Sequence, residues 1–308
     1  MSAPAIAPPR PVGLWRRLLS DRAAAAALGL LALLALASAL SPFLVSQNPY
    51  DPAQLDVLDA EIPPLWSEGG VSRFPLGTDA QGRDMLSAML FGTGISLTIG
   101  LLAVAIQAVL GVSIGLAAGY VGGRLDGLLM RIADIQLSLS TLMVAIIALA
   151  IFQTLFGAEN FGRLAVPLLV VVIGVAEWPQ FARTVRGSVL AERAKDYVLA
   201  AEALGLAPPR IVRRHILPNV ASSIVVVATL QVANAVMAEA ALSFLGLGMP
   251  VSQPSLGALI RAGFDLIFSG VWWITMLPSL VLIALILSIN LIGDFLRDAL
   301  NPRLDRAR

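Results

Sequence analysis

The stretch ISLTIGLLAVAIQAVLGVSIGLAAGY, residues 95–120, contains no charged side chain. A helix needs about 20 predominantly apolar residues to cross roughly 30 Å of hydrocarbon, and this stretch is longer than that. Gly111, Gly115 and Gly119 recur at every fourth position, a spacing that lets two helix backbones approach closely inside a membrane. The stretch therefore predicts a transmembrane helix that packs tightly against a neighbouring helix.

Five further apolar runs of similar length accompany it. The six expected spans are residues 23–44, 95–120, 129–156, 164–184, 218–245 and 271–296. The chain of 308 residues is 57% hydrophobic and only 13% charged, which leaves too little polar surface for a soluble domain. The alternation of period two that is typical of a transmembrane β-barrel is absent from the sequence. We therefore expect an all-α membrane protein with six transmembrane helices.

The first apolar run has an alternative interpretation as a secretory signal peptide. Arg16, Arg17 and Arg22 precede an Ala/Leu run, and residues 37–39 resemble a cleavage site. The run is long for a signal sequence, however, and five more spans already commit the chain to the membrane. We favour a transmembrane helix.

The basic residues are distributed unevenly among the connections. Seventeen of the 21 Lys and Arg residues precede the first span or lie in the second-to-third connection, the fourth-to-fifth connection or the C-terminal tail. Cytoplasmic loops carry an excess of basic residues, so both termini are expected in the cytoplasm. The expected organisation is a cytoplasmic N-terminal segment 1–22, a first transmembrane helix 23–45, a periplasmic loop 46–91, a core domain of five helices 92–296 with a cytoplasmic connection 185–217, and a cytoplasmic tail 297–308.

The expected periplasmic loop is rich in proline and acidic residues, which predicts an extended loop rather than a folded domain. Its last part differs, because residues 76–84 mix turn residues with charged ones. From the residues alone we predict a structured turn at the membrane surface, with Asp84 or a neighbour capping the helix that leads into the second span. The residues of interest in this turn are Gly77, Thr78, Asp79, Gly82, Arg83 and Asp84.

The connection 185–217 is the largest expected cytoplasmic feature. Residues 197–205 predict a short amphipathic helix that ends at a C-cap glycine, Gly205, and Pro208 and Pro209 suit the start of a second helix. Small alanines on an exposed face of the first helix would permit the close approach of a partner. The alternative is a surface helix that binds lipid headgroups through its arginines.

Residues 200–218 resemble the EAA loop of ATP-binding-cassette (ABC) importer permeases, whose pattern is Glu-Ala-Ala, three residues, Gly, nine residues, Ile, one residue, Leu-Pro. Two positions depart from it, because Leu199 occupies the glutamate position and His215 the isoleucine position. The resemblance implies that this loop is a coupling helix that docks into a cleft of an ATPase. The implied coupling residues are Leu199, Ala200, Ala201, Glu202, Gly205, Arg210, Arg213, Arg214, His215, Leu217 and Pro218.

Three more segments, residues 76–84, 238–248 and 293–303, are similar to signatures of the dipeptide/oligopeptide/nickel branch of these permeases, and specifically to its second-permease (C-type) subunit. The resemblance implies a type I ABC importer permease fold. It also implies a second homologous permease, two cytoplasmic ATPases and an external substrate-binding protein as partners, in the inner membrane and without nucleic acid. Peptides are the expected substrate, and nickel chelates or glutathione are alternatives.

The chain lacks the residues of an ATPase or an enzyme. Its single lysine, Lys195, is followed by Asp196, so the Gly-Lys-Ser/Thr of a Walker A loop is missing. One histidine and no cysteine leave no credible metal cluster in the sequence. We therefore expect no catalytic activity and no bound cofactor in this chain, with ATP used by the partner subunits.

Four carboxylates fall within or near the expected spans, where a charge at the bilayer centre costs ~2.5–3.5 kcal/mol. Asp134 and Asp294 sit near cytoplasmic ends, where contacts at the helix ends explain them. Glu239 lies deeper, and Glu177 precedes a proline that invites a kink. Glu239, Glu177 and Asp134 are candidates for lining a pathway. The same carboxylates would serve as proton sites in an ion-coupled secondary carrier, which is an alternative function for this chain. A non-transporting membrane scaffold is a third.

Overall fold

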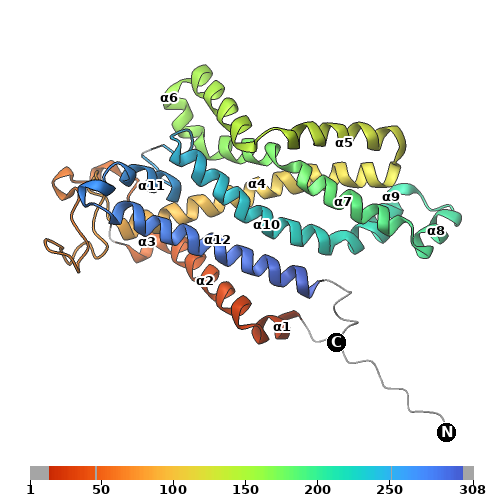
Figure 1. Ribbon diagram of the computed structural model, residues 1–308, viewed down its shortest axis with the longest axis horizontal. Helices are drawn as coiled ribbons and strands as arrows, with labels where there is room; N and C mark the ends of the chain where they lie inside the picture. Colours follow the sequence, from red (N-terminus) through yellow and green to blue (C-terminus); the bar gives the residue numbers. More distant parts are fainter. Residues whose placement is uncertain (1–13, 46, 251, 301–308) are drawn as a thin grey trace, which may run out of the picture.

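The computed structural model describes residues 14–45, 47–250 and 252–300. The helices run roughly along one long axis, with the segment between α3 and α4 at one end and with α8 and α9 at the other (Figure 1). They are α1 (Leu14–Ser20), α2 (Arg22–Ala39), α3 (Ser41–Leu44), α4 (Met85–Val121), α5 (Gly123–Ser138), α6 (Thr141–Ala176), α7 (Trp178–Arg193), α8 (Asp196–Ala203), α9 (Pro208–Ile211), α10 (Leu217–Phe244), α11 (Leu256–Phe264) and α12 (Trp273–Ala299).

Four helices are long and apolar enough to cross a membrane, and the number rises to six if each of two bent pairs is one span. The four are α2, α4, the continuous helix Pro208–Phe244 and α12. Helix α6 is interrupted at Gly157, whose φ of 76° and ψ of 161° are not helical, so its two halves belong to different spans. The bent pairs are Gly123–Ser138 with Thr141–Gly157, and Asn160–Ala176 with Trp178–Arg193. The six expected spans are therefore all present, but two of them are broken.

The third expected span, residues 129–156, is wrong as a single straight helix. The chain bends by 84° between α5 and α6, and Leu139 at the break has an extended backbone. Two ion pairs accompany the bend: Asp126 of α5 contacts Arg186 of α7, and Asp134 of α5 contacts Arg183 of α7, at 2.5 Å each. These contacts hold α5 alongside α7 (Figure 1), while α6 leaves α5 at the bend and packs against α4 and α10.

The fourth expected span bends by 40° between α6 and α7. The break lies at Glu177, immediately before Trp178 and Pro179 of the first turn of α7. A proline at this position suits the start of a new helix but cannot continue the old one, because its ring clashes with the preceding turn. The kink predicted from Pro179 is thus confirmed.

Helix α4 is the centre of the bundle, where it contacts α6, α7 and α10. It begins at Met85, ten residues before the expected start of the second span. The Asp84 carboxylate accepts a hydrogen bond of 2.9 Å from the backbone N–H of Ser87, so the predicted N-cap is confirmed.

Gly111, Gly115 and Gly119 of α4 face α7, which gives the close helix contact that their spacing predicts. A Cβ atom added to Gly111 would lie 2.4 Å from Cβ of Phe181 and 2.5 Å from the backbone oxygen of Trp178. Additions to Gly115 and Gly119 would meet atoms of α7 at 2.7 and 2.8 Å. The α4–α7 contact therefore exists only because these positions lack a side chain.

Replacing Gly111 with alanine is expected to destabilise the protein by about 1–3 kcal/mol, because the obstructing atoms belong partly to backbone and cannot move aside. Gly29→Ala in α2 is the matched control, since a Cβ there would meet nothing within 4 Å. Both changes add the same methyl group to a helix, so a lower thermal midpoint for Gly111→Ala alone measures the clash. Equal midpoints for the two variants would contradict the close contact.

The fifth expected span also begins earlier than predicted. Residues Pro208–Phe244 form one helix that contains a π-helical turn at Val212–Ile216. Within this turn the N–H of Leu217 donates to the carbonyl of Val212, five residues back. The wider turn makes room for Pro218, whose ring would clash with the carbonyl four residues earlier in a regular α-helix. The basic residues before Pro218 are therefore helical, which confirms the second helix predicted from Pro208 and Pro209. Its continuity with the fifth span was not expected.

Candidate coupling site and buried polar clusters

The short helix α8 has one buried and one exposed face. Val198 and Ala201 are buried in an apolar cluster with residues of α7, α9 and α10. Leu199 is 51% and Leu204 is 80% exposed, and Ala200 and Ala203 are exposed beside them. We call these four residues the outer face of α8. Apolar side chains that remain exposed on a firmly packed helix are typical of a protein-docking surface.

The end of α8 is a Schellman motif, in which two backbone hydrogen bonds close the helix. The N–H of Gly205 donates to Glu202 at 3.0 Å, and the N–H of Leu206 donates to Ala201 at 3.2 Å. Gly205 has φ +74°, a left-handed conformation that favours glycine. The predicted C-cap is confirmed, and it sets the direction in which the chain leaves α8.

Glu202 turns away from the outer face. Its carboxylate accepts a hydrogen bond of 3.4 Å from the Tyr120 hydroxyl and lies 3.7 Å from the Arg193 guanidinium. Arg193 also donates to the backbone oxygen of Tyr120 at 2.7 Å and covers its ring. This expected coupling residue therefore anchors α8 to the last turns of α4 and α7.

Tyr197 makes a second connection, which the sequence reasoning missed. Its hydroxyl donates to Glu192 of α7 and accepts a hydrogen bond of 3.2 Å from Asn219 of α10. Burial and the bond to Glu192 raise the pKa of Tyr197 to about 12, so the phenol keeps its proton at physiological pH. Asn219 also donates to the His215 carbonyl at 2.7 Å. One tyrosine thus ties α8 to two membrane helices.

The remaining expected coupling residues belong to the helix that follows α8. Arg210, Arg213, Arg214 and Pro218 are exposed, and His215 and Leu217 are half-buried. Within residues 14–45, 47–250 and 252–300, the guanidinium groups of the three arginines form no hydrogen bond and no ion pair. They make this end of the bundle strongly positive, and we call it the basic end.

At the opposite end, residues 47–84 form a compact cap, and the expectation of an extended loop is wrong. Phe74 is 3% exposed, and two 3₁₀ turns, Pro52–Gln54 and Val57–Asp59, fold the segment on itself. The side-chain amide of Gln47 donates to the carbonyls of Gln54 and Gly82 at 3.0 and 3.3 Å. In this cap, backbone carbonyls accept hydrogen bonds from a buried side chain, whereas the carbonyls of an open loop would bond to water.

The turn at residues 76–84 is the centre of this cap. Arg83 donates to the Asp79 carboxylate at 2.6 Å, and these two side chains are only 2% and 1% exposed. The hydroxyl of Thr78 donates to the carbonyl of Asp59 at 2.5 Å, and Trp273 of α12 donates to the Thr78 carbonyl at 3.0 Å. The motif therefore has a structural role as a clasp between the cap and α12.

The two motif glycines permit close backbone contacts in this clasp. Gly77 and Gly82 have φ +80° and +74°. A Cβ on Gly82 would lie 2.0 Å from the carbonyl oxygen of Asp56, and one on Gly77 would lie 2.6 Å from that of Ile62. Both positions therefore require glycine for conformation and for space.

Glu239 lies fully buried among hydroxyl groups. Ser96 of α4 and Ser243 of α10 each donate to its carboxyl group at 2.7 Å, and Ser255 at the start of α11 is a third partner. The residue joins three helices, which favours the interpretation as a hydrogen bond across helices over that of pathway lining.

Glu239→Gln should change stability little, because an amide retains most of this hydrogen bonding, whereas Glu239→Ala should cost about 1–3 kcal/mol by leaving buried hydroxyls without a partner. The thermal midpoint of each variant measures the difference. Equal losses of stability in the two variants would instead show that the ionisable group itself is required.

Glu177 belongs to a chain of polar groups between α4 and α10. Gln231 donates to Gln107 at 3.1 Å and to Glu177 at 2.9 Å. The exposed Asn234 donates to Gln231 at 2.8 Å. The sequence reasoning missed the three amides, although isolated Gln and Asn residues in apolar runs are a usable signal. Asp134 lies elsewhere, in the exposed ion pair with Arg183, and Asp294 is exposed on α12.

A bundle of membrane helices that holds a short helix rigidly at one end, with an apolar face left uncovered, defines a membrane subunit that works with a docked partner. A family model described as binding-protein-dependent transport system inner membrane component matches residues 111–306. A second, the N-terminal transmembrane domain of oligopeptide transport permease C, matches residues 13–64. The chain belongs to the family of binding-protein-dependent transport system inner membrane components.

Relatives cover nearly the whole chain. The di/tripeptide transport system permease protein DppC of Pseudomonas aeruginosa is 36% identical over 99% of this chain and 97% of its own. The dipeptide permease DppC of Bacillus subtilis is 35% identical, covering 95% and 85%. The glutathione transport system permease protein GsiD of Pectobacterium atrosepticum is 36% identical, covering 94% and 90%.

The fold has a counterpart among solved structures. A chain from the inward-facing MetNI methionine ABC transporter matches with a TM-score of 0.56 and 21% identity, over 72% of this chain and 97% of that chain. The protein is thus a permease subunit of an ABC importer with the type I fold, as the sequence resemblance implies. The N-terminal match favours a transmembrane helix over a signal peptide, and the comparisons give no support to a secondary carrier.

Proposed function

We propose that this permease pairs with a second, homologous permease to form the translocation path of a peptide importer. The substrate class is inferred from the relatives, which are named for di/tripeptides, dipeptides and glutathione. An external binding protein delivers the peptide at the cap end, and two ATPases supply the energy at the basic end. The excess of basic residues supports a cytoplasmic location for the basic end and for both termini.

The outer face of α8 is the observation that carries the proposal. It is the docking surface for an ATPase, since Leu199, Ala200, Ala203 and Leu204 are exposed on a helix whose other face is buried. The coupling residues split accordingly. Ala200 and Leu199 contact the ATPase, whereas Ala201, Glu202 and Gly205 hold the helix in position.

Closure of the ATPases pushes on α8, and the anchors of α8 transmit the push. Tyr197 passes it to α7 and α10, and Glu202 passes it to α4 and α7 through Tyr120 and Arg193. Because these contacts tie one short helix to three membrane helices, the helices move together as a rigid body. Such rocking opens the path alternately to each side of the membrane.

Among the three pathway candidates, we assign the pathway role to Glu177. It is half-buried, and its polar chain reaches the exposed Asn234 on α10. Glu239 is sealed among serines and Asp134 is neutralised by Arg183, so both have structural partners instead.

Deleting residues 200–205 is expected to abolish transport and ATPase stimulation while the chain still inserts in the membrane. Peptide uptake, substrate-stimulated ATP hydrolysis and the amount of membrane-inserted permease are measured together. Uptake that survives the deletion would show that coupling does not pass through α8.

A further inference from the structure

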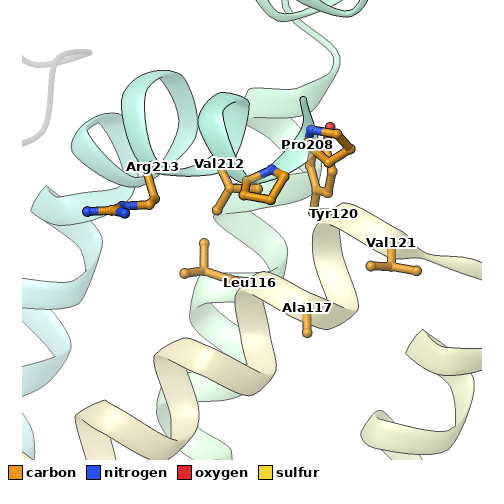
Figure 2. A pocket seen from close by; sticks show the side chains of 8 residues that line it. Leu116, Ala117, Tyr120, Val121, Pro208, Val212 and Arg213 are labelled. Carbon is orange, nitrogen blue, oxygen red and sulfur yellow. The ribbon is translucent and has the colours of Figure 1, made fainter. Parts of the chain in front are cut away.

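Two adjoining hollows lie at the basic end, beside α8 and outside its outer face. The first is a pocket of about 310 Å³ between the last turns of α4 and the start of α9. Its walls are apolar, with Leu116, Ala117 and Val121 on one side and Pro208 and Val212 on the other. Figure 2 shows Leu116 facing Val212 and Pro208 across the pocket, with Arg213 at one side and its guanidinium group extending outward.

The second hollow, of about 570 Å³, is basic. Arg210, Arg213 and Arg214 line it together with Pro209 and Pro218. Pro209 and Arg213 also line the first pocket, so the apolar and the basic hollow adjoin each other across these two residues. The three exposed arginines have no polar partner among the described residues, and their positive charge is therefore available to an anion.

The two hollows lie where the charge-free run of α4 ends. Residues 95–120 contain no charged side chain, and the next charged residue is Arg124. Helix α4 is one of the helices long and apolar enough to cross a membrane, and it ends at Val121, so we place Leu116, Ala117 and Val121 near the headgroups, with the arginines beyond them. An apolar hollow on the membrane side of a basic one has the polarity of a lipid molecule.

We propose that these hollows together bind one anionic phospholipid. An acyl chain fills the apolar pocket, and the headgroup phosphate contacts Arg210 and Arg213, in the manner of basic pockets between membrane helices. Acidic groups on a docked ATPase would pair with the arginines, but such docking gives no reason for an apolar pocket beside α4. The inference rests on the membrane placement proposed above and not on coupling through α8. The lipid would brace α9, which directly follows the coupling helix, against α4.

The test uses the purified transporter complex in detergent, titrated with phosphatidylglycerol and separately with phosphatidylcholine, with bound lipid counted by native mass spectrometry. The complex should bind one phosphatidylglycerol in preference to phosphatidylcholine. Arg210→Gln/Arg213→Gln should weaken that binding about 25-fold, since each arginine contributes about 5-fold. Arg124→Gln/Arg131→Gln, which removes two exposed charges from α5, should leave it unchanged.

A second pair of variants tests the apolar pocket without a change in charge. Ala117→Trp should fill the pocket and displace the lipid, whereas Leu125→Trp, at a 40% exposed position on α5, should not. Three results would overturn the proposal. Equal binding of both lipids would show that the headgroup charge is not recognised, and competition by glycerol phosphate as effective as by the lipid would show that the acyl chain is not. Arginine variants that retain phosphatidylglycerol and lose the ATPases would assign the arginines to a protein partner. A failed deletion test at residues 200–205 would leave this binding measurement unaffected, so the two proposals can fail separately.

Discussion

Leu204→Asp is expected to abolish peptide transport and to separate the permease from its ATPases. Leu204 is 80% exposed at the end of α8 and belongs to the proposed docking face. Docking removes this side chain from water, and an aspartate there would bring an unpaired charge into the interface at a cost of several kcal/mol. A loss of ~3 kcal/mol lowers the affinity by more than about 100-fold. Uptake and the co-purification of ATPase subunits measure the effect.

Two variants make this prediction specific. Leu125→Asp adds the same charge to a 40% exposed leucine on α5 and should leave ATPase binding intact. Leu199→Glu adds a charge to the outer face itself, but it restores the residue type that the EAA pattern has at this position, and it should retain coupling. If Leu199→Glu and Leu204→Asp fail equally, any charge on the outer face is harmful and the resemblance at Leu199 carries no functional meaning.

Arg83→Ala is expected to cause the largest loss of stability, about 3–5 kcal/mol. The change leaves the Asp79 carboxylate, 1% exposed, without a guanidinium group that now lies 2.6 Å away. Two backbone N–H groups, of Gln81 and Arg83, still contact that carboxylate, but they do not neutralise it. Because the turn also bonds to Trp273, the cap should loosen from α12 as well.

The control for this variant is Arg73→Ala in the same cap. Arg73 pairs with Asp59 at 3.4 Å, but its side chain is 67% exposed, and such surface pairs contribute about 0–1 kcal/mol. Thermal unfolding and limited proteolysis within residues 47–84 should therefore distinguish the two arginines. Equal midpoints would contradict the burial of the clasp.

Local sequence patterns predicted the features that depend on neighbouring residues along the chain. Gly205 ends α8, Asp84 caps α4 and Pro179 marks a break, because capping and proline geometry act within one helical turn. The bend after α5 was missed, since the ion pairs that hold α5 against α7 join residues about 50–60 positions apart, Asp134 with Arg183 and Asp126 with Arg186. The compact cap was missed for the same reason, because Gln47 bonds to Gly82, 35 residues further along the chain, and Trp273 reaches the cap from α12.

The candidate site divides in the same way. The spacing in residues 199–218 identified α8 and its family, because a pattern of small residues, glycine and proline is encoded locally. Only the tertiary structure separated Leu199 and Leu204, which are exposed, from Glu202 and Ala201, which are anchored. Likewise, the sequence located Glu239 and Glu177 in membrane helices but did not distinguish them. Their different surroundings, serines for one and a chain of amides for the other, come from three helices that meet only after folding.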